Sequence, residues 1–559
     1  MRLKIIIIIS LLIYQTNAYS KTTEKNEFNQ KYLSSYLSAL ISYDNQKNNL
    51  AIKFFNSSKF LIRKHENFLK SYILSLIHDG QIKKAINQAK FLKDHNNSNF
   101  FEAKLLLVLD SIYKKDYLNA SERLKELKNY NKNETFEFII YKIVESYNNL
   151  FLFKKIENNN ENFGKLSLIT NAFQNCYLNS GKTDLSFANI INSSDGDYSR
   201  YLFFYLGNLI DNNDYDQISK ISFTIEHFKS SLLISQTKKW IEEKNYKKLK
   251  NYFSCKNEND LLAEFFFLIS NLYSSQEKFE ESNFYLRISN YLNPKFYFNL
   301  SLLADNYYLD NNFETAKKIL KNFDKKDDVY YWYKIKKIAQ ILSKEKNEEA
   351  SLKYVENKFQ DIKNPSPKIL YDLANIYKNF KNYEKAIDYY TIVLNSLDNK
   401  SSVYADVLYR RGGSFERKGE HSKSDNDLLR ALEIRPDDPY TMNYLAYSWL
   451  ERSYKINEAM EMLKLAYNKK EDDPYITDSV GWAYYLIEDY KTAETYLKKA
   501  VELMPYDPIV NDHYGDVLWK LNRKLQAKYF WENVLELDDT DEKMKSDIRF
   551  KLLNGPNKI

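Results

Sequence analysis

Small and large apolar residues recur along this chain at an interval of about 34 residues. In the best-marked unit, Gly481 and Tyr484 fall on one side of a first helix, and Ala493, Leu497 and Ala500 fall on one side of a second. Residues three, four and seven positions apart share a face of an α-helix, so each unit has the pattern of two amphipathic helices joined by a short turn. The pattern predicts a series of helical hairpins over most of the chain.

The same register continues on both sides of that unit. One more unit follows it and two precede it, one of them with an extra residue in the internal turn. The three series are Tyr514-Gly515/Leu518/Ala527/Trp531/Val534, Leu445-Ala446/Trp449/Ala459/Leu463/Ala466 and Arg411-Gly412/Phe415/Ser424/Leu428/Ala431. Small side chains where two helices cross let their axes approach to about 8–10 Å. A single hairpin cannot bury both of its apolar faces, so consecutive hairpins are expected to stack.

This pattern resembles the tetratricopeptide repeat, which carries small residues at positions 8, 20 and 27 and large apolar residues at 4, 7, 11 and 24. The resemblance is strongest over residues 401–540. It implies an all-α fold, a right-handed α-α superhelix of about 11–14 helical hairpins. The expected organisation is a signal peptide at 1–18, degenerate hairpins at 19–130, an irregular helical region at 131–255, repeat-like units at 256–400, well-matched repeats at 401–540 and a capping helix at 541–559.

The composition excludes several other fold classes. The 559 residues include only 11 Gly and 9 Pro, well below the roughly 12% that these two residues reach together in average proteins. Sandwiches, barrels and doubly wound sheets of this size need many turns built on Gly or Pro, so they are disfavoured. Hydrophobic residues make up 44% of the chain, which excludes a chain disordered throughout. The net charge of +7 is mild, and residues 401–559 are net negative, so we expect no nucleic-acid partner.

The first residues have the pattern of an export signal. The segment Met1–Lys4 is short and positively charged, and an apolar run follows at Ile5–Tyr14. Small residues then lead up to Ala18. This arrangement predicts a secretory signal peptide cleaved after Ala18. A retained membrane anchor is the less favoured alternative, because the run is shorter than the roughly 20 residues that span a bilayer. We therefore expect an exported protein without a transmembrane span in its mature chain, most simply periplasmic, with secretion or peripheral envelope association as alternatives.

The chain has two cysteines, Cys176 and Cys255, which lie 79 residues apart in the sequence. An oxidising compartment would allow them to pair, but the sequence cannot show that they meet. Two separate buried thiols are the somewhat favoured interpretation, and pairing stays open.

Motifs of catalysis are missing from the sequence. It contains no phosphate-binding glycine loop, no nucleophile elbow and no zinc-protease motif. The cluster Asn511–Asp516, with His513 inside it, has the composition of a site, but no nucleophile or metal partner accompanies it. A structural histidine beside the packing face is therefore favoured, and hydrolysis at this cluster is a remote alternative. We expect no enzyme activity, no cofactor and no metal.

The resemblance also implies a binding groove, lined by positions 2, 5, 9 and 12 of each first helix. The residues at these positions are Tyr440, Asn443, Tyr447, Tyr475, Asp478, Trp482, Tyr485, Asp512, Asp516 and Trp519, together with Leu450 and Ile509. Aromatic side chains supply contact area at low entropy cost, and Asn or Asp can hydrogen-bond to a peptide backbone. The alternative is that these aromatic residues only pack between helices.

Two functional hypotheses follow from these observations. The leading hypothesis is an exported scaffold without catalysis that binds a protein or peptide in its groove, in envelope assembly or maintenance, with cell-envelope components among the candidate partners. The second is a carbohydrate- or peptidoglycan-associated accessory module of an envelope enzyme, because grooves rich in aromatic residues and Asp also suit sugars.

Overall fold

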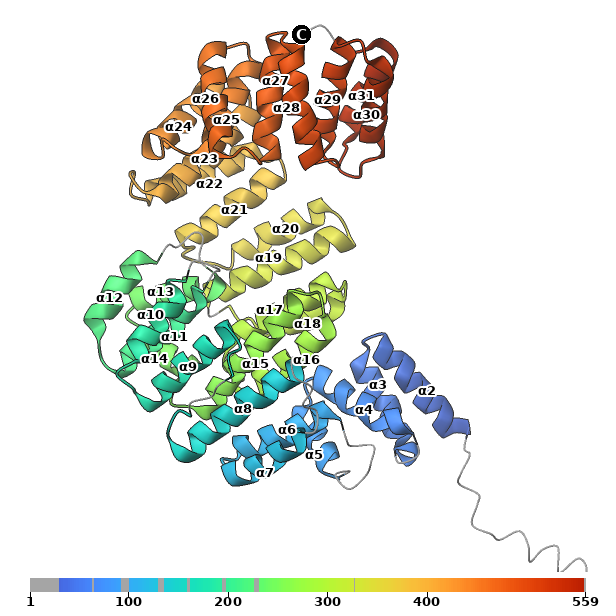
Figure 1. Ribbon diagram of the computed structural model, residues 1–559, viewed down its shortest axis with the longest axis vertical. Helices are drawn as coiled ribbons and strands as arrows, with labels where there is room; N and C mark the ends of the chain where they lie inside the picture. The colour runs from blue at the N-terminus through green and yellow to red at the C-terminus, as the bar shows by residue number, and fades with distance from the viewer. Residues whose placement is uncertain are drawn as a thin grey trace, which may run out of the picture. The chain divides into compact units, whose positions relative to one another are not determined.

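The computed structural model describes residues 30–556 except 63–64, 92–99, 129–134, 158–160, 194–197, 226–230 and 326. Within these residues, all regular elements are helical: 30 α-helices and one short 3-10 helix, with no strand. The predicted all-α class is confirmed (Figure 1). The predicted signal peptide, residues 1–18, lies outside the described residues.

The chain divides into two compact units, unit 1 at Met1–Asn347 and unit 2 at Glu348–Ile559. The helices of unit 1 are α2 (Gln30–Asp44), α3 (Asn48–Ser57), η1 (Lys59–Leu61), α4 (Glu66–His78), α5 (Ile82–Phe91), α6 (Phe101–Tyr113), α7 (Tyr117–Leu127), α8 (Phe136–Phe153), α9 (Lys165–Leu178), α10 (Thr183–Ile191), α11 (Arg200–Asp211), α12 (Tyr215–Thr224), α13 (Leu232–Glu242), α14 (Tyr246–Tyr252), α15 (Glu258–Ser274), α16 (Phe279–Leu292), α17 (Phe298–Leu309), α18 (Phe313–Leu320) and α19 (Asp328–Glu345).

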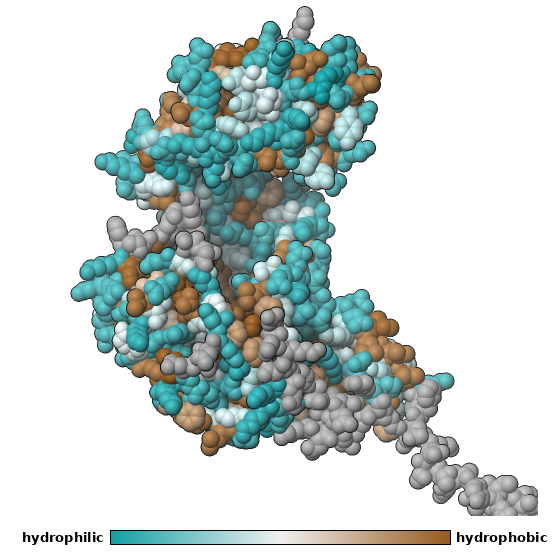
Figure 2. Space-filling model, viewed as in Figure 1, coloured by the Kyte–Doolittle hydropathy of each residue, from teal (hydrophilic) through white to brown (hydrophobic). Residues whose placement is uncertain are grey.

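The helices of unit 2 are α20 (Glu348–Phe359), α21 (Pro367–Asn379), α22 (Tyr383–Asn395), α23 (Ser402–Arg417), α24 (His421–Ile434), α25 (Pro439–Glu451), α26 (Ile456–Lys469), α27 (Pro474–Leu486), α28 (Tyr490–Leu503), α29 (Pro508–Lys520), α30 (Lys524–Glu536) and α31 (Glu542–Asn554). From α21 onward they pack in consecutive pairs, and each pair packs against the next. Figure 2 shows hydrophobic side chains scattered among hydrophilic ones on the visible surface of this unit.

The small residues of the repeat lie where the two helices of a hairpin cross. Gly481 of α27 faces Leu497 of α28 so closely that a Cβ atom added to the glycine would lie 2.6 Å from the leucine Cγ. Gly412 meets Leu428 in the same way, at 3.1 Å. These contacts explain why the sequence pattern requires a small residue at this position, because any larger side chain would push the helices apart.

The turns inside the hairpins do not depend on glycine. In the turn after α27, Glu488 adopts a left-handed conformation with φ of 64°, and the Asp489 N–H donates to the Tyr484 carbonyl at 3.0 Å. This six-to-one hydrogen bond closes the end of the helix. The same conformation and bond recur in further turns of the described residues, at Gln46, Gly80, Lys115, Asn179, Asn213, Lys244, Glu277, Asn311, Lys381, Gly419, Ser453 and Asn522. The backbone bonds stabilise the left-handed residue, so a glycine-poor chain can reverse direction at each repeat.

A disulfide joins Cys176 and Cys255, whose Cα atoms are 5.7 Å apart. The interpretation as two separate thiols was therefore wrong. The pairing follows from aromatic packing, because Phe253 contacts Phe173 of α9 and Phe204 of α11 with ring centroids 5.7 and 4.5 Å apart. This cluster carries the segment after α14 back onto the end of α9.

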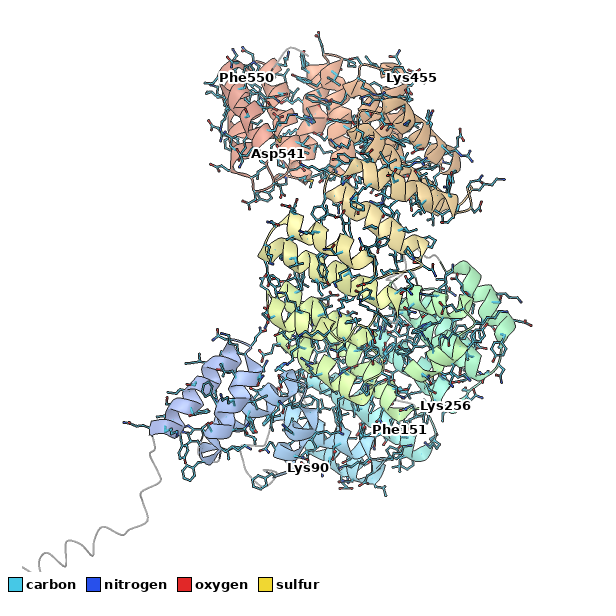
Figure 3. The ribbon with its side chains drawn as sticks, turned by 180° about the vertical axis from the view of Figure 1, so that it is seen from behind. Lys90, Phe151, Lys256, Lys455, Asp541 and Phe550 are labelled. Carbon is cyan, nitrogen blue, oxygen red and sulfur yellow. A yellow bond between two sulfur atoms is a disulfide. The ribbon has the colours of Figure 1, made fainter. Side chains whose placement is uncertain are left out.

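The residue after the disulfide strengthens this connection. The ammonium of Lys256, labelled in Figure 3, donates to the Cys176 and Tyr177 carbonyls at 2.9 and 3.1 Å. These carbonyls belong to the last turn of α9, where helical carbonyls have no partner within the helix and a cation is favourable. The lysine therefore closes the end of α9 as well as binding two distant segments together.

The predicted terminal helix is present as α31, which packs on α30 and buries Ile548 completely. Asp541 caps its first turn by accepting from the Met544 N–H at 2.9 Å, and Phe550 lies on its exposed side (Figure 3). The helix covers the apolar surface of the last hairpin. It also carries Lys551, which matters for the site described next.

Candidate functional site

The first helices of three successive hairpins, α25, α27 and α29, pack side by side in unit 2. Each begins with an Asp-Pro pair, in which the aspartate accepts hydrogen bonds from the first turn and the proline occupies the first helical position. In α27, the Asp473 carboxylate accepts from the Tyr475 and Ile476 N–H groups, both at 3.1 Å. Because all three helices start in the same way, equivalent repeat positions lie on equivalent faces.

Repeat position 2 is exposed in all three helices. Tyr440, Tyr475 and Ile509 leave 48%, 52% and 52% of their surface accessible. They lie 35 and 34 residues apart, one repeat each. We call these three residues the apolar row. Large apolar side chains that recur at one position of adjacent helices form a surface that a partner can contact at several points.

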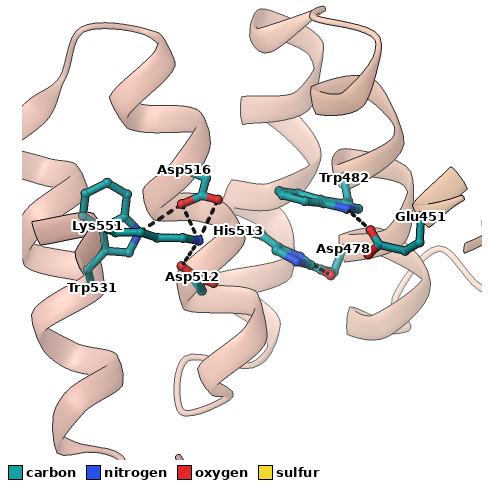
Figure 4. A network of polar contacts seen from close by, with 8 residues as sticks. All are labelled: Glu451, Asp478, Trp482, Asp512, His513, Asp516, Trp531 and Lys551. Carbon is teal, nitrogen blue, oxygen red and sulfur yellow. Dashed lines mark hydrogen bonds and ion pairs between the residues drawn. The ribbon is translucent and has the colours of Figure 1, made fainter. Parts of the chain in front are cut away.

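Trp482, at position 9 of α27, lies inside the helix packing rather than on its surface. Its indole N–H donates to Glu451 Oε1 at 2.8 Å. Its ring stacks on the His513 ring at a centroid distance of 4.0 Å (Figure 4). On the same helix, the Tyr485 ring stacks on it at 4.7 Å. Trp482 therefore joins α25, α27 and α29.

His513 is buried beside an equally buried Asp478. The two carboxylate oxygens of Asp478 lie 2.9 and 3.1 Å from His513 Nδ1 (Figure 4). Burial disfavours a charged imidazole, but the charge and hydrogen bond of Asp478, together with the charges of Asp512 and Asp516, outweigh it and raise the pKa of His513 above its usual value. The pair is an internal ion pair between α27 and α29, in agreement with the structural role favoured for this histidine.

A second ion cluster connects α29 with α31. The Lys551 ammonium donates to Asp512 Oδ1 at 2.7 Å and to the two Asp516 oxygens at 2.8 and 2.9 Å. Trp531 of α30 donates its indole N–H to Asp516 at 3.2 Å. Burial, followed by the charge of Asp512, raises the pKa of Asp516 to about 6, although Lys551 opposes the shift.

This network, drawn in Figure 4, holds helices together with paired charges. The Lys551 ammonium occupies the space between Asp512 and Asp516, and Asp478 is engaged by His513. Among the described residues, no group of three or more His, Cys, Asp or Glu side chains is arranged to hold a metal ion. Sequence reasoning missed Glu451 and Lys551, since Lys551 follows the two aspartates by 39 and 35 residues and lies outside the repeat register.

The ten residues predicted to line a groove therefore differ widely in accessibility. Tyr440 and Tyr475 are exposed. Asn443, Tyr447, Asp512 and Trp519 are partly buried, and Asp478, Trp482, Tyr485 and Asp516 are buried. The assignment of these residues to a binding surface stays a prediction.

Comparison with known families agrees with the geometry of the hairpins. A tetratricopeptide repeat family model matches residues 367–394, which cover α21 and nearly all of α22, and residues 479–507, which cover the second part of α27 and all of α28. The chain therefore contains tetratricopeptide repeats in these two segments. The repeat register seen in the sequence is thus confirmed in both matched segments.

Known relatives of this repeat protein share part of its length. The TPR repeat-containing protein PA4667 of Pseudomonas aeruginosa is 32% identical over 111 residues, which are 20% of this chain and 19% of that protein. The chain thus matches about a fifth of the length of this curated relative.

Two solved structures are also similar. A thermophilic TPR protein of Thermus thermophilus is 18% identical, with a TM-score of 0.30, over 34% of this chain and 100% of that one. A tetratricopeptide repeat protein of Parabacteroides merdae is 13% identical, with a TM-score of 0.34, over 52% and 98%.

Proposed function

We propose that this repeat protein is a scaffold without catalysis of its own, which binds an extended segment of a protein partner across α25, α27 and α29. The observation that carries the proposal is the apolar row of Tyr440, Tyr475 and Ile509. Three large exposed side chains at one repeat position give three anchor points along a line, and an extended peptide presents side chains along a line in the same way.

A polar group beside the row supports the same conclusion. The side-chain oxygen of Asn443, one turn from Tyr440 on α25, is buried and has no hydrogen-bond partner among the described residues. A buried acceptor without a partner costs free energy, and a backbone N–H of a bound peptide would satisfy it. Asn443 thus adds a specific polar contact to the apolar anchors.

The buried residues among those predicted to line the groove contribute to this surface indirectly. Trp482 and Tyr485 stack on each other, and Asp478 binds His513. A partner could reach them only by breaking these contacts. We therefore place the interface on the apolar row and the partly buried Asn443, with the Trp482 network as its rigid support.

Export to an oxidising compartment, most simply the periplasm, is part of the proposal. The disulfide between Cys176 and Cys255 supports it, because structural disulfides persist in exported proteins and are rare in the reducing cytosol. Within residues 30–556, the described helices do not combine the length and apolar character that a bilayer span requires. A role in envelope assembly or maintenance would follow from this location.

A site-specific crosslinking experiment in cells tests the interface. A photo-crosslinking amino acid at position 475 should capture a partner, and the triple variant Tyr440→Ser/Tyr475→Ser/Ile509→Ser should lower affinity for that partner at least tenfold. The matched control is Leu465→Ser/Leu525→Ser/Tyr529→Ser, which removes three large side chains, each at least half exposed, from second helices. The proposal fails if the row variant binds the captured partner as tightly as the control does.

The same variants distinguish a carbohydrate-binding surface from a peptide-binding one. If purified peptidoglycan pellets the wild-type protein but not the row variant, and position 475 yields no protein crosslink, the surface binds sugar rather than peptide. Exposed tyrosines suit both ligands, so this comparison decides between them.

A further inference from the structure

A cavity of about 380 Å³ lies within unit 1, between its N-terminal hairpins and the repeats formed by α16–α18. Two parts of the chain more than 200 residues apart enclose it, in agreement with their neighbouring positions in Figure 1. The residues that line it are Gln46, Lys47, Asn48, Asn49, Leu50, Lys53, His78, Asp79, Arg287, Tyr307, Thr315 and Lys318.

Polar contacts hold the two sides of the cavity together. Asn312 donates to the Gln46 side chain at 3.3 Å, and Lys318 forms an ion pair with Asp79 at 3.6 Å. Beside the cavity, Tyr43 donates to Glu280 and joins the same two parts of the chain. Lining residues of the two walls are therefore linked to each other directly.

Positive charge dominates the lining. Lys47, Lys53, Arg287 and Lys318 line the cavity, against the single carboxylate of Asp79, which is already paired with Lys318. Opposite charges stabilise an anion in such a cleft, and the low-dielectric walls strengthen the effect.

The start of α3 adds uncapped backbone N–H groups. Its N-cap residue, Lys47, forms no capping hydrogen bond, and the next three residues line the cavity. At the same place in three other hairpins, Asp116, Asp214 and Asn312 accept a hydrogen bond from the first turn with their own side chains, whereas Lys278 leaves α16 uncapped as Lys47 leaves α3. The first turn of α3 thus offers free donors and the positive end of the helix dipole to an anion.

A buried histidine also lines the cavity. His78 is 5% exposed, and no hydrogen bond links it to another described residue; its nearest acidic atom, Glu280 Oε1, is 3.8 Å away. Burial and the charge of Arg287 lower the pKa of His78 to about 3, so the imidazole is neutral and can donate one hydrogen bond. The Nε of Arg287 is a second buried donor that lacks a partner among the described residues.

We propose that this cavity binds the phosphate group of a small phosphorylated sugar. The phosphate would lie among the first turn of α3, Lys47, Arg287 and His78. A second cavity of about 210 Å³ adjoins the first and shares Gln46, Asn48, His78 and Tyr307 with it. Its further lining residues include Asp44, Glu280 and Asn283. Glu280 and Asn283 already accept from Tyr43 and Asn306, and their oxygens have lone pairs left to accept a further hydrogen bond from a hydroxyl group. The two cavities thus suit a ligand with an anionic end and a hydroxyl-rich end.

Calorimetric titration of the full chain with three probes tests the chemistry. Glucose 6-phosphate should bind at least tenfold more tightly than inorganic phosphate, and glucose alone should not bind at millimolar concentration. Equal affinity for glucose and glucose 6-phosphate would overturn the proposal, because the phosphate would then contribute nothing.

The variant Lys47→Asp tests the location. An aspartate at this N-cap supplies the missing capping carboxylate to α3 and places a negative charge in the cavity. Glucose 6-phosphate should bind at least tenfold more weakly, while the melting temperature stays the same or rises, which excludes unfolding as the cause.

The control variant is Lys83→Gln/Lys84→Gln, two exposed lysines of α5 outside the cavity. Its affinity for glucose 6-phosphate should equal that of the wild type. An unchanged affinity in Lys47→Asp, or an equal loss in the control, would overturn the proposal.

Discussion

Two regions of the molecule solve the same packing problem by different means. In unit 2, helices α23–α31 stack in a nearly constant register, and small residues such as Gly481 set the distance between them. In unit 1, helices α9–α15 depart from that register, and a disulfide and a buried ion pair hold distant segments together. The regular repeat is thus built from many equivalent contacts between neighbouring helices, whereas the irregular region adds links between segments 64 and 79 residues apart.

The ion pair of unit 1 joins α11 and α15. Arg200 binds Glu264 through two hydrogen bonds of 2.8 and 2.6 Å, and Glu264 is 1% exposed. The guanidinium carbon also lies 3.8 Å from the centroid of the Phe267 ring. Desolvation raises the pKa of Glu264, and the charge and hydrogen bonds of Arg200 oppose this rise. The ionised form of Glu264 is therefore stabilised by Arg200.

The largest expected effect comes from breaking this pair. Glu264→Ala leaves the Arg200 charge buried without its partner and should destabilise unit 1 by about 3–5 kcal/mol. Urea unfolding followed by circular dichroism measures the change. Glu122→Ala, which removes an exposed ion pair with Lys125, should cost less than about 1 kcal/mol. Equal losses in the two variants would contradict the contrast between buried and exposed pairs.

Removing the disulfide should have the next largest effect. Cys176→Ser/Cys255→Ser frees a loop of 79 residues, and loop-closure entropy predicts a loss of up to about 4 kcal/mol. Thermal unfolding with and without a reducing agent measures it. Reductant should lower the melting temperature of the wild type and leave the double variant unchanged; a wild type insensitive to reductant under unfolding conditions would count against the bond as a source of stability.

A smaller effect is expected from a single close contact in the regular repeats. Gly481→Ala places a Cβ against Leu497 and should destabilise unit 2 by about 1–3 kcal/mol through overpacking. The control is Gly207→Ala in α11, where a Cβ would meet no atom within 4 Å. That change should stabilise the protein by up to about 1 kcal/mol, because alanine favours the helix. The two variants should therefore change the free energy of unfolding, measured by urea unfolding, in opposite directions.

The smallest effect concerns pH. The pKa of Asp516 rises from 3.8 to about 6 in the folded protein, so the folded state binds this proton more tightly and stability is lost as pH rises through that window. The raised pKa of His513 adds a loss of the same sign as pH rises above the usual histidine value. Asp516→Asn should flatten the dependence of melting temperature on pH between about 4 and 6. An unchanged slope would show that Asp516 titrates normally.

The repeat pattern allowed much of unit 2 to be predicted from the sequence. Gly481, Ala493 and Leu497 were assigned to the hairpin contact from their spacing, and the structure places them there. The left-handed turns were not predicted, because residues such as Glu488 and Lys381 carry no signal for that conformation. Backbone hydrogen bonds formed only in the complete turn stabilise it.

In the candidate site, too, some features follow from the sequence pattern and others only from the fold. Tyr475 and Trp482 occupy predicted groove positions on one helix, yet Tyr475 is exposed and Trp482 is buried. The difference comes from their neighbours, since Trp482 has the His513 ring stacked on it and Glu451 at its indole N–H. No pattern within α27 contains this information.

By itself, the sequence determined the helical hairpins, their register and the type of repeat, because the spacing of apolar side chains along a helix is a local property. The tertiary structure alone decided which cysteines pair, which charges Lys551 neutralises and which aromatic side chains stay exposed. These outcomes depend on distances between residues tens to hundreds of positions apart, and such distances exist only after the hairpins have stacked.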